Sequence, residues 1–454
     1  MRQVSKEFYE LSNMRSVWND LLYRHVIRQN IPIPGLGGKS IESLTTKQLE
    51  KSLSRALRLR QNWTAELPLV KRRLNLDAIP GHRIVSIHLL PGSVPQKIIS
   101  LSMSYGQRRF FVLECWELHH TNPIRLARRE LHRFSGLALN KTVSDGGFIA
   151  ILNPHVEILS LDLQAIDAAH GFRTLATIQE EQSGISLFSG SSILTRDNNS
   201  RLYLWDINRP QSKIELRNPS LDQPFSLLEA VVTQDFIVAL KVTTLELYAL
   251  PSLATASVHN AVLHPVFTFQ WPWRIDHGVM TLRHRPAKNP ETTSNGIYIV
   301  MRFSSYFPWA INLLHHYEVR PNPFFLKNSP VSVANLPYEF PPVLRETIGS
   351  PVRLHATSDL AIGPYGTAIW TDSHTEDYFN HADRGQRLAG RFSPYISGEE
   401  DEGVELSDQV ATALATSVYA YQEEDSWVRV AFDETEGRIV VGRDDGNISV
   451  LEFI

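Results

Sequence analysis

The sequence predicts an all-β protein with a small α-helical N-terminal head, and the β part is predicted to be a β-propeller of seven blades. Three observations support this class. Helical periodicity is confined to the first 63 residues, short β-rich runs separated by turn residues begin at His82, and these runs recur at a nearly constant spacing. We expect a helical segment at 1–30, a linker with one capped helix (about 45–63) at 31–81, and the propeller at 82–454.

The bulk composition is that of a globular protein. The 454 residues are 43% hydrophobic and 20% charged, with a formal net charge of −3, so no overall field favours nucleic acid or an anionic membrane. The single cysteine, Cys115, excludes an intramolecular disulfide and favours a reducing compartment. With no apolar run long enough to span a membrane, we expect a cytoplasmic or nuclear protein without nucleic-acid or membrane partners.

The first 26 residues predict two short amphipathic helices. Val4, Phe8 and Leu11 form one apolar stripe. A second stripe comprises Val17, Trp18, Leu21, Leu22 and Val26. Ser12 and Asn13 lie between the stripes and are expected to cap the second helix. Helices this short cannot bury both stripes on each other, so the head must pack against something else.

A third helix has the clearest start signal in the chain. Thr45 and Gln48 have the spacing of a capping box, and Leu44 and Leu49 that of a hydrophobic staple. Residues 51–73 carry seven basic side chains against one acidic one. This basic face is either solvated or a docking patch for an acidic partner or nucleic acid. The solvated face is favoured, because no aromatic–glycine nucleic-acid motif accompanies the charge.

Repeated strand-like runs predict the propeller. They lie at 111–118, 156–161, 201–207 and 244–250, and a hairpin with an Asp445-Gly446 turn ends the chain. Trp116, Leu159, Trp205 and Tyr248 align as equivalent positions, separated by 43, 46 and 43 residues. This period is typical of propeller blades.

The later blades are interrupted by insertions. Tyr317, Trp370 and Leu451 are the next equivalents, and the gaps contain a polar insertion at 286–295 and an acidic one at 397–406. We expect the ring to close with strands from both ends of the β region. An α/β fold would need helical crossovers, and only 163–178 could supply one; this segment is better interpreted as a blade edge.

Few residues suggest chemistry. The densest polar cluster, at 373–385, contains His374, Glu376, Asp377, His381 and Asp383. These side chains could converge on a divalent cation and support a metal-dependent hydrolase, but their spacing matches no metal motif, so a hydrated loop is favoured. The hydrolase motif Gly-x-Ser-x-Gly is absent, and residues 35–39 lack the spacing of a phosphate loop. We therefore expect no enzyme, no cofactor and no metal.

Aromatic residues divide into core and candidate binding positions. Trp116, Trp205 and Cys115 are expected to be buried in blades. Trp271, Trp273 and Arg274 lie in an irregular segment and are candidates for substrate binding, together with His374 and Asp377. For the two tryptophans, packing in the core is the favoured alternative.

The opening segment RQVSKEFYELSNMRSVWNDLLYRHV resembles the second half of an F-box, with Ser16, Val17 and Trp18 opening its final helix. A linker, a capped helix and WD-like repeats follow, so the chain resembles a fungal F-box protein with a degenerate WD-repeat-like propeller. Members of that family dock on the Skp adaptor of cullin–RING ubiquitin ligases. The leading Leu-Pro segment and first helix of an F-box are missing. We expect either a start at an internal methionine of a longer product, which the retained apolar residues favour, or a degenerate F-box.

The resemblance implies a substrate receptor of a ubiquitin ligase. Its helical head would bind the adaptor and its propeller would bind a protein substrate not identified by the sequence. The residues implied in adaptor binding or head packing are Val4, Phe8, Leu11, Val17, Trp18 and Leu22. The alternative is a non-catalytic propeller that serves as a protein-interaction scaffold without a ligase link.

Overall fold

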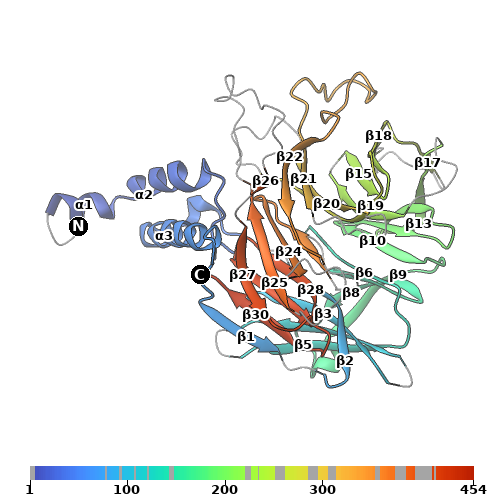
Figure 1. The fold of residues 1–454 in the computed structure, drawn as a ribbon, viewed down its shortest axis with the longest axis horizontal. Coiled ribbons are helices and arrows are strands. Elements are labelled where there is room, and N and C mark those ends of the chain that lie inside the picture. The colour runs from blue at the N-terminus through green and yellow to red at the C-terminus, as the bar shows by residue number, and fades with distance from the viewer. Residues whose placement is uncertain are drawn as a thin grey trace.

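The computed structural model contains a β-propeller from which a helical head projects to one side (Figure 1). It describes residues 6–454 except 77–78, 91–94, 107–108, 120–121, 143–147, 220–225, 234, 251–260, 285–294, 305–312, 353–357, 374–384, 394–411 and 414–415. The C-terminus lies near the base of the head, close to α3 (Thr46–Trp63), whereas the N-terminus lies at the far tip of the head.

Seven sheets of four or five strands form the blades. The first two are β2 (His82–Leu89), β3 (Lys97–Ser104), β4 (Phe111–Glu117) and β5 (Ile124–Leu131), then β6 (Gly136–Leu139), β7 (Ile149–Asn153), β8 (His155–Leu161) and β9 (Phe172–Ile178). The third is β10 (Gly184–Ser189), β11 (Ser192–Arg196), β12 (Leu202–Asp206), β13 (Arg209–Leu216) and β17 (Ala261–Leu263). The fourth is β14 (Leu227–Val232), β15 (Phe236–Lys241), β16 (Thr244–Ala249) and β18 (Phe267–Gln270).

The remaining blades complete the ring. The fifth is β19 (Ile275–Leu282), β20 (Ile297–Phe303), β21 (Leu313–Val319), β22 (Val343–Gly349) and β26 (Thr412–Ala413), and the sixth is β23 (Leu360–Ile362), β24 (Thr367–Ser373), β25 (Gln386–Phe392) and β27 (Ser417–Gln422). The seventh joins β28 (Trp427–Asp433), β29 (Arg438–Arg443) and β30 (Ile448–Glu452) to β1 (Arg72–Leu76). The predicted propeller of seven blades is confirmed.

Pairing of β1 with β30 closes the ring, as expected from strands drawn from both ends. Backbone hydrogen bonds of an open blade edge are satisfied in this way. The first propeller strand therefore begins at Arg72, inside the segment expected to be linker. The segment 163–178 supplies only a short 3₁₀ turn (Ala168–His170) and the edge strand β9, which rules out a helical crossover there.

The proposed period holds for six of its seven positions. Trp116, Leu159, Trp205, Tyr248, Tyr317 and Leu451 all lie on the third strand of their blades. Trp370 lies on β24, a second strand, and the third-strand equivalent is Ala389. Ala389 adjoins a register shift between the third and fourth strands, and Trp116, Leu159 and Tyr317 adjoin the same shift. The equivalent position in the sixth blade was misassigned because the insertions before β25 and β27 change the spacing between its strands.

The head contains three helices, α1 (Lys6–Asn13), α2 (Arg15–Leu22) and α3 (Thr46–Trp63), with a π turn at Tyr23–Ile27 and a 3₁₀ turn at Ile41–Ser43. The capping box of Thr45 and Gln48 is confirmed, with Thr45 N donating to Gln48 Oε1 at 2.8 Å. The expected cap at Ser12 or Asn13 is wrong. α1 continues through Asn13, and Met14 occupies the cap position of α2 without a side-chain bond.

Candidate functional site

Two faces of the ring follow from the alternating strand directions. Connections from first to second and from third to fourth strands emerge on one face, which we call the head face. Connections from second to third strands and between blades emerge on the opposite face, the far face. The head contacts the connection from β23 to β24 through Thr367 and that from β28 to β29 through Gly437, so it sits on the head face.

The head has a core of its own. Leu22, Val26, Leu49 and Ala56 are fully buried in a cluster between α2 and α3. Trp18 packs against this cluster and donates from Nε1 to Ser12 O at 2.7 Å. The second apolar stripe is therefore buried mainly by the capped helix, because α2 packs on α3.

The C-terminal turn of α3 anchors the head in the ring. Leu59 and Trp63 are 1% and 4% exposed and lie in one cluster with the sixth and seventh blades. Trp63 Nε1 donates to Thr367 Oγ1 at 3.0 Å, and the Tyr419 hydroxyl donates to Trp63 O at 2.9 Å. Gly437 has φ +62°, and a Cβ there would lie 2.3 Å from Leu59 Cδ1. The helix thus approaches the ring so closely that only glycine fits at this turn.

A buried carboxylate lies beneath this anchor. Glu434, which is 4% exposed, accepts from Tyr365 N at 2.8 Å, from Thr367 N at 3.0 Å and from the Thr367 hydroxyl. Burial raises the pKa of Glu434 to about 7, although these hydrogen bonds and the Arg60 charge oppose the shift. Arg60 itself lies over the Phe392 ring at 3.6 Å, and burial lowers its pKa. Thr367 connects the carboxylate directly to Trp63.

A second contact holds the linker that follows the π turn. Asn30 Nδ2 donates to His284 O at 3.2 Å, and His284 Nδ1 lies 2.9 Å from Asn30 Oδ1. The His284 ring stacks on Tyr365, with 4.4 Å between centroids. Gly35 N donates to Glu436 Oε1 at 2.7 Å. The head therefore contacts the fifth, sixth and seventh blades and is fixed at more than one point.

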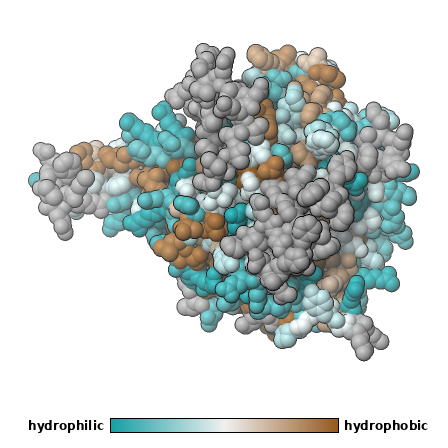
Figure 2. Space-filling view, in the orientation of Figure 1, coloured by the Kyte–Doolittle hydropathy of each residue, from teal (hydrophilic) through white to brown (hydrophobic). Residues whose placement is uncertain are grey.

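The far end of the head leaves apolar side chains exposed. Tyr9, Leu11 and Met14 are 54%, 49% and 50% exposed, and Figure 2 shows brown, hydrophobic atoms on this part of the head. Among the predicted head residues, Leu22 and Trp18 serve packing, Val17 is half-buried, and Leu11 is available to a partner. Val4 and the side chain of Phe8 lie outside the described residues.

The candidate substrate residues are separated by the structure. Trp271 is 3% exposed and packs on Phe269 and Tyr317 in a blade core, which corrects its assignment as a substrate contact. Its neighbour Trp273 is 57% exposed and Arg274 is exposed, both on the connection from β18 to β19 at the far face. His374 and Asp377 lie outside the described residues. Trp116, Trp205 and Cys115 are buried in blades as predicted.

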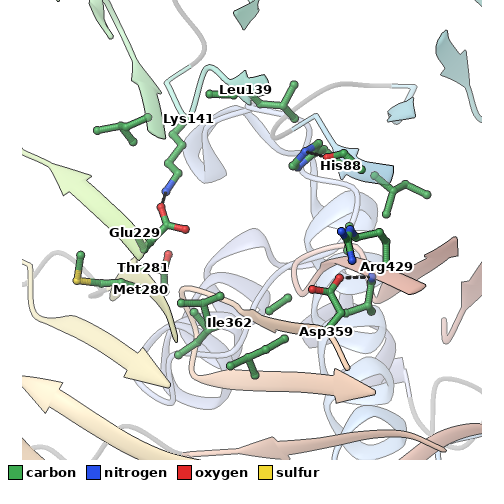
Figure 3. Close-up of a pocket in the computed structure, with 18 of the residues that line it drawn as sticks. His88, Leu139, Lys141, Glu229, Met280, Thr281, Asp359, Ile362 and Arg429 are labelled. Atoms are coloured by element: carbon green, nitrogen blue, oxygen red, sulfur yellow. Dashed lines mark hydrogen bonds and ion pairs between the residues drawn. The ribbon is translucent and has the colours of Figure 1, made fainter. Parts of the chain in front are cut away.

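The axis of the ring contains a cavity of about 610 Å³. Residues from the first strand of every blade line it, including His88, Leu139, Glu229, Met280, Ile362 and Arg429, and Asp359 lines it from the position just before β23 (Figure 3). Lys141 and Glu229 form an ion pair of 3.1 Å on one wall. His88, Arg429 and Asp359 lie on the other wall.

Sequence reasoning missed the central polar residues. Glu434, Asp359 and Arg429 belong to no motif, and each becomes notable only because the ring brings distant strands together. One signal was available: Arg429 interrupts the apolar run WVRVAF, in which a charged residue next to apolar neighbours indicates a channel or an interface.

The described part of the chain contains no group of three or more metal-ligating side chains. Within the same residues, no helix has the length and apolar character needed to cross a bilayer.

Comparison with known proteins shows the fold and nothing finer. No family model matches the sequence, and no curated protein matches it.

Solved structures do match. A chain from a structure of ctPRC2 in complex with H3K27me3 and H3K27M aligns over 86% of this chain and 98% of its own, with TM-score 0.53 and 9% identity. A chain from an active polycomb repressive complex 2 in the basal state has TM-score 0.51 over the same shares, again at 9% identity. A humanized mutant of the Chaetomium thermophilum complex bound to GSK126 gives 0.50 at the same identity and coverage. The comparisons thus show that the chain has a β-propeller fold.

Proposed function

We propose that this protein is a rigid connector between two protein partners and that it acts as the substrate receptor of a cullin–RING ubiquitin ligase. The head would bind a Skp-type adaptor, and the far face of the propeller would bind a protein substrate. The connector would do no chemistry itself. It would raise the effective concentration of the substrate near the transferring enzyme.

The observation that carries the proposal is the anchor of α3. Trp63 and Leu59 fix the head to the ring, whereas Tyr9, Leu11 and Met14 at the opposite end of the head stay exposed. Apolar side chains that gather at one end of an element favour a partner that covers them. A rigid anchor with an uncovered tip is the arrangement that a connector requires, and the F-box resemblance of residues 2–26 supports an adaptor as the partner.

The experiment is a binding titration of the full chain with a purified Skp adaptor. We expect binding, and we expect Leu11→Asp to weaken it at least tenfold, since a charge would be buried at the interface. Leu163→Asp is the matched control because Leu163 is 73% exposed on the propeller; it should bind like the parent chain. Equal binding by both variants would contradict a role for the tip of the head.

The second candidate is a propeller scaffold without a ligase link. The exposed Trp273 and Arg274 on the far face favour a protein partner on the ring in either case. The two functions differ in the adaptor alone. If the chain does not bind the adaptor, and a version extended upstream through a complete F-box does not bind it either, the scaffold is the correct function.

A further inference from the structure

The channel along the axis of the ring has the size of a small-molecule site. Its volume of about 610 Å³ lies within the range of roughly 300–1,000 Å³ that is common for such sites. The walls are mixed. Side chains of Leu89, Leu139, Phe188, Met280 and Phe432 contribute apolar surface, while six ionisable side chains face the same space. Neither function proposed above uses this cavity.

Arg429 is held in place but not neutralised. Its Nε donates to Val85 O at 2.6 Å and its Nη1 to Val428 O at 2.7 Å, so two backbone carbonyls fix the guanidinium. Among the described residues it makes no ion pair, and Nη2 has no hydrogen-bond acceptor. An oriented guanidinium with unused donors is suited to a carboxylate.

Asp359 lies beside Arg429 and has unused acceptor capacity. Its Oδ2 accepts from Val430 N at 2.7 Å, which places the carboxylate next to the arginine along the same wall (Figure 3). The two groups nevertheless form no ion pair within 4.0 Å in the described structure. A carboxylate has about four lone-pair sites, so Asp359 can also accept from an ammonium group.

The other ionisable groups leave the cavity without net charge. Lys141 and Glu229 neutralise each other on the opposite wall. His88 is neutral because burial and the nearby Lys141 and Arg429 charges lower its pKa to about 4. Burial also lowers the pKa of His277, in spite of the Asp359 charge. Burial raises the pKa of Asp359, although the Val430 N–H and the Arg429 charge oppose the shift. With Asp359 ionised, the cavity contains two cations and two anions, and a ligand with net charge would leave one charge uncompensated in a partly desolvated site.

We propose that the channel binds a small zwitterion of the α-amino-acid class, with its carboxylate on Arg429, its ammonium group on Asp359 and its side chain against the apolar wall. The carboxylate and ammonium of such a ligand are adjacent, as are Arg429 and Asp359. A ligand of this kind satisfies both unpaired groups and keeps the cavity neutral.

The test is calorimetric titration of the full chain with L-leucine, L-phenylalanine and L-serine. For each amino acid, two half-ligands are titrated in parallel, one lacking the amino group and one lacking the carboxylate; for L-leucine these are 4-methylpentanoate and 3-methylbutylamine. We expect at least one amino acid to bind at about one per chain and about tenfold more tightly than both of its half-ligands. No binding by any of the three, or equal binding by a half-ligand, would overturn the proposal.

Variants locate the site. Arg429→Met and Asp359→Asn should each weaken binding of the amino acid about tenfold or more. Arg443→Met removes an arginine from β29 of the same blade, outside the channel, and should bind like the parent chain. Thermal unfolding without ligand checks that each variant folds. If Arg429→Met does not fold, Asp359→Asn decides, because an asparagine still accepts from Val430 N. Unchanged affinity in folded Asp359→Asn would exclude the channel as the site.

Discussion

At the scale of single residues, Glu434 is the most informative side chain. It is buried under the head with its hydrogen bonds satisfied by Thr367 and Tyr365, yet it is an acid whose ionisation is opposed by burial. Its pKa is raised from 4.5 to about 7 in the folded chain. Between pH 4.5 and about pH 7, the folded protein therefore keeps a proton on Glu434 that the unfolded chain has lost.

This shift predicts a pH dependence of stability. The stability that protonation of Glu434 contributes to the free energy of unfolding is fully present below pH 4.5. It is lost as the pH rises to about 7, and it does not change further above that pH. The lost free energy of unfolding is on the order of 3 kcal/mol. In denaturant titrations from pH 5 to pH 8, Glu434→Gln should show a flatter decline than the parent chain. Glu423→Gln, an exposed control, should keep the parental slope; parallel curves for parent and Glu434→Gln would contradict the shift.

Two tryptophans allow a matched comparison of burial. Trp63 is 4% exposed and donates to Thr367, whereas Trp273 is 57% exposed. Trp63→Ala should lower the free energy of unfolding by about 3–5 kcal/mol. The substitution leaves a cavity between the head and the ring, and the Thr367 hydroxyl loses its hydrogen-bond donor. Trp273→Ala should cost less than about 1 kcal/mol. Chemical denaturation of both variants measures this, and similar losses would show that Trp63 does not anchor the head.

At the scale of elements, local chemistry determined what could be predicted. The start of α3 followed from Thr45 and Gln48, and the last hairpin from Asp445 and Gly446, because caps and tight turns depend on neighbours in sequence. The break between α1 and α2 was misplaced, since Met14 has no capping side chain to mark it. Trp370 was assigned to the wrong strand because insertions of unequal length precede the third and fourth strands of its blade.

Gly437 tests how closely α3 and the ring approach each other. Its φ is +62°, and a Cβ added at this position would lie 2.3 Å from Leu59 Cδ1, which leaves no room for a side chain. Gly437→Ala should therefore destabilise the chain by at least about 1 kcal/mol. Gly190→Ala is the matched control: it also has a positive φ, +59°, but an added Cβ would meet nothing within 4 Å. Thermal shifts of equal size in the two variants would mean that backbone strain alone, without the helix contact, explains the effect.

At the scale of the whole molecule, closure of the ring brings together residues that are far apart in the sequence. The propeller itself could be predicted from a period near 43 residues. The channel charges could not, because Arg429 and Asp359 are 70 positions apart in sequence and become neighbours only when the sixth and seventh blades pack. The anchor was equally hidden, since Trp63 and Thr367 are separated by 304 positions. Residues at such distances leave no periodic pattern.

The central claim is that head and ring form one rigid connector. It is tested most directly by the distance distribution between spin labels at Asn19→Cys on α2 and Gln211→Cys on β13, both exposed positions. The only native cysteine, Cys115, is fully buried and should not be labelled. We predict a single narrow distribution that broadens when Trp63→Ala is added. A broad distribution without that substitution would contradict the claim, because the head would then move independently of the propeller.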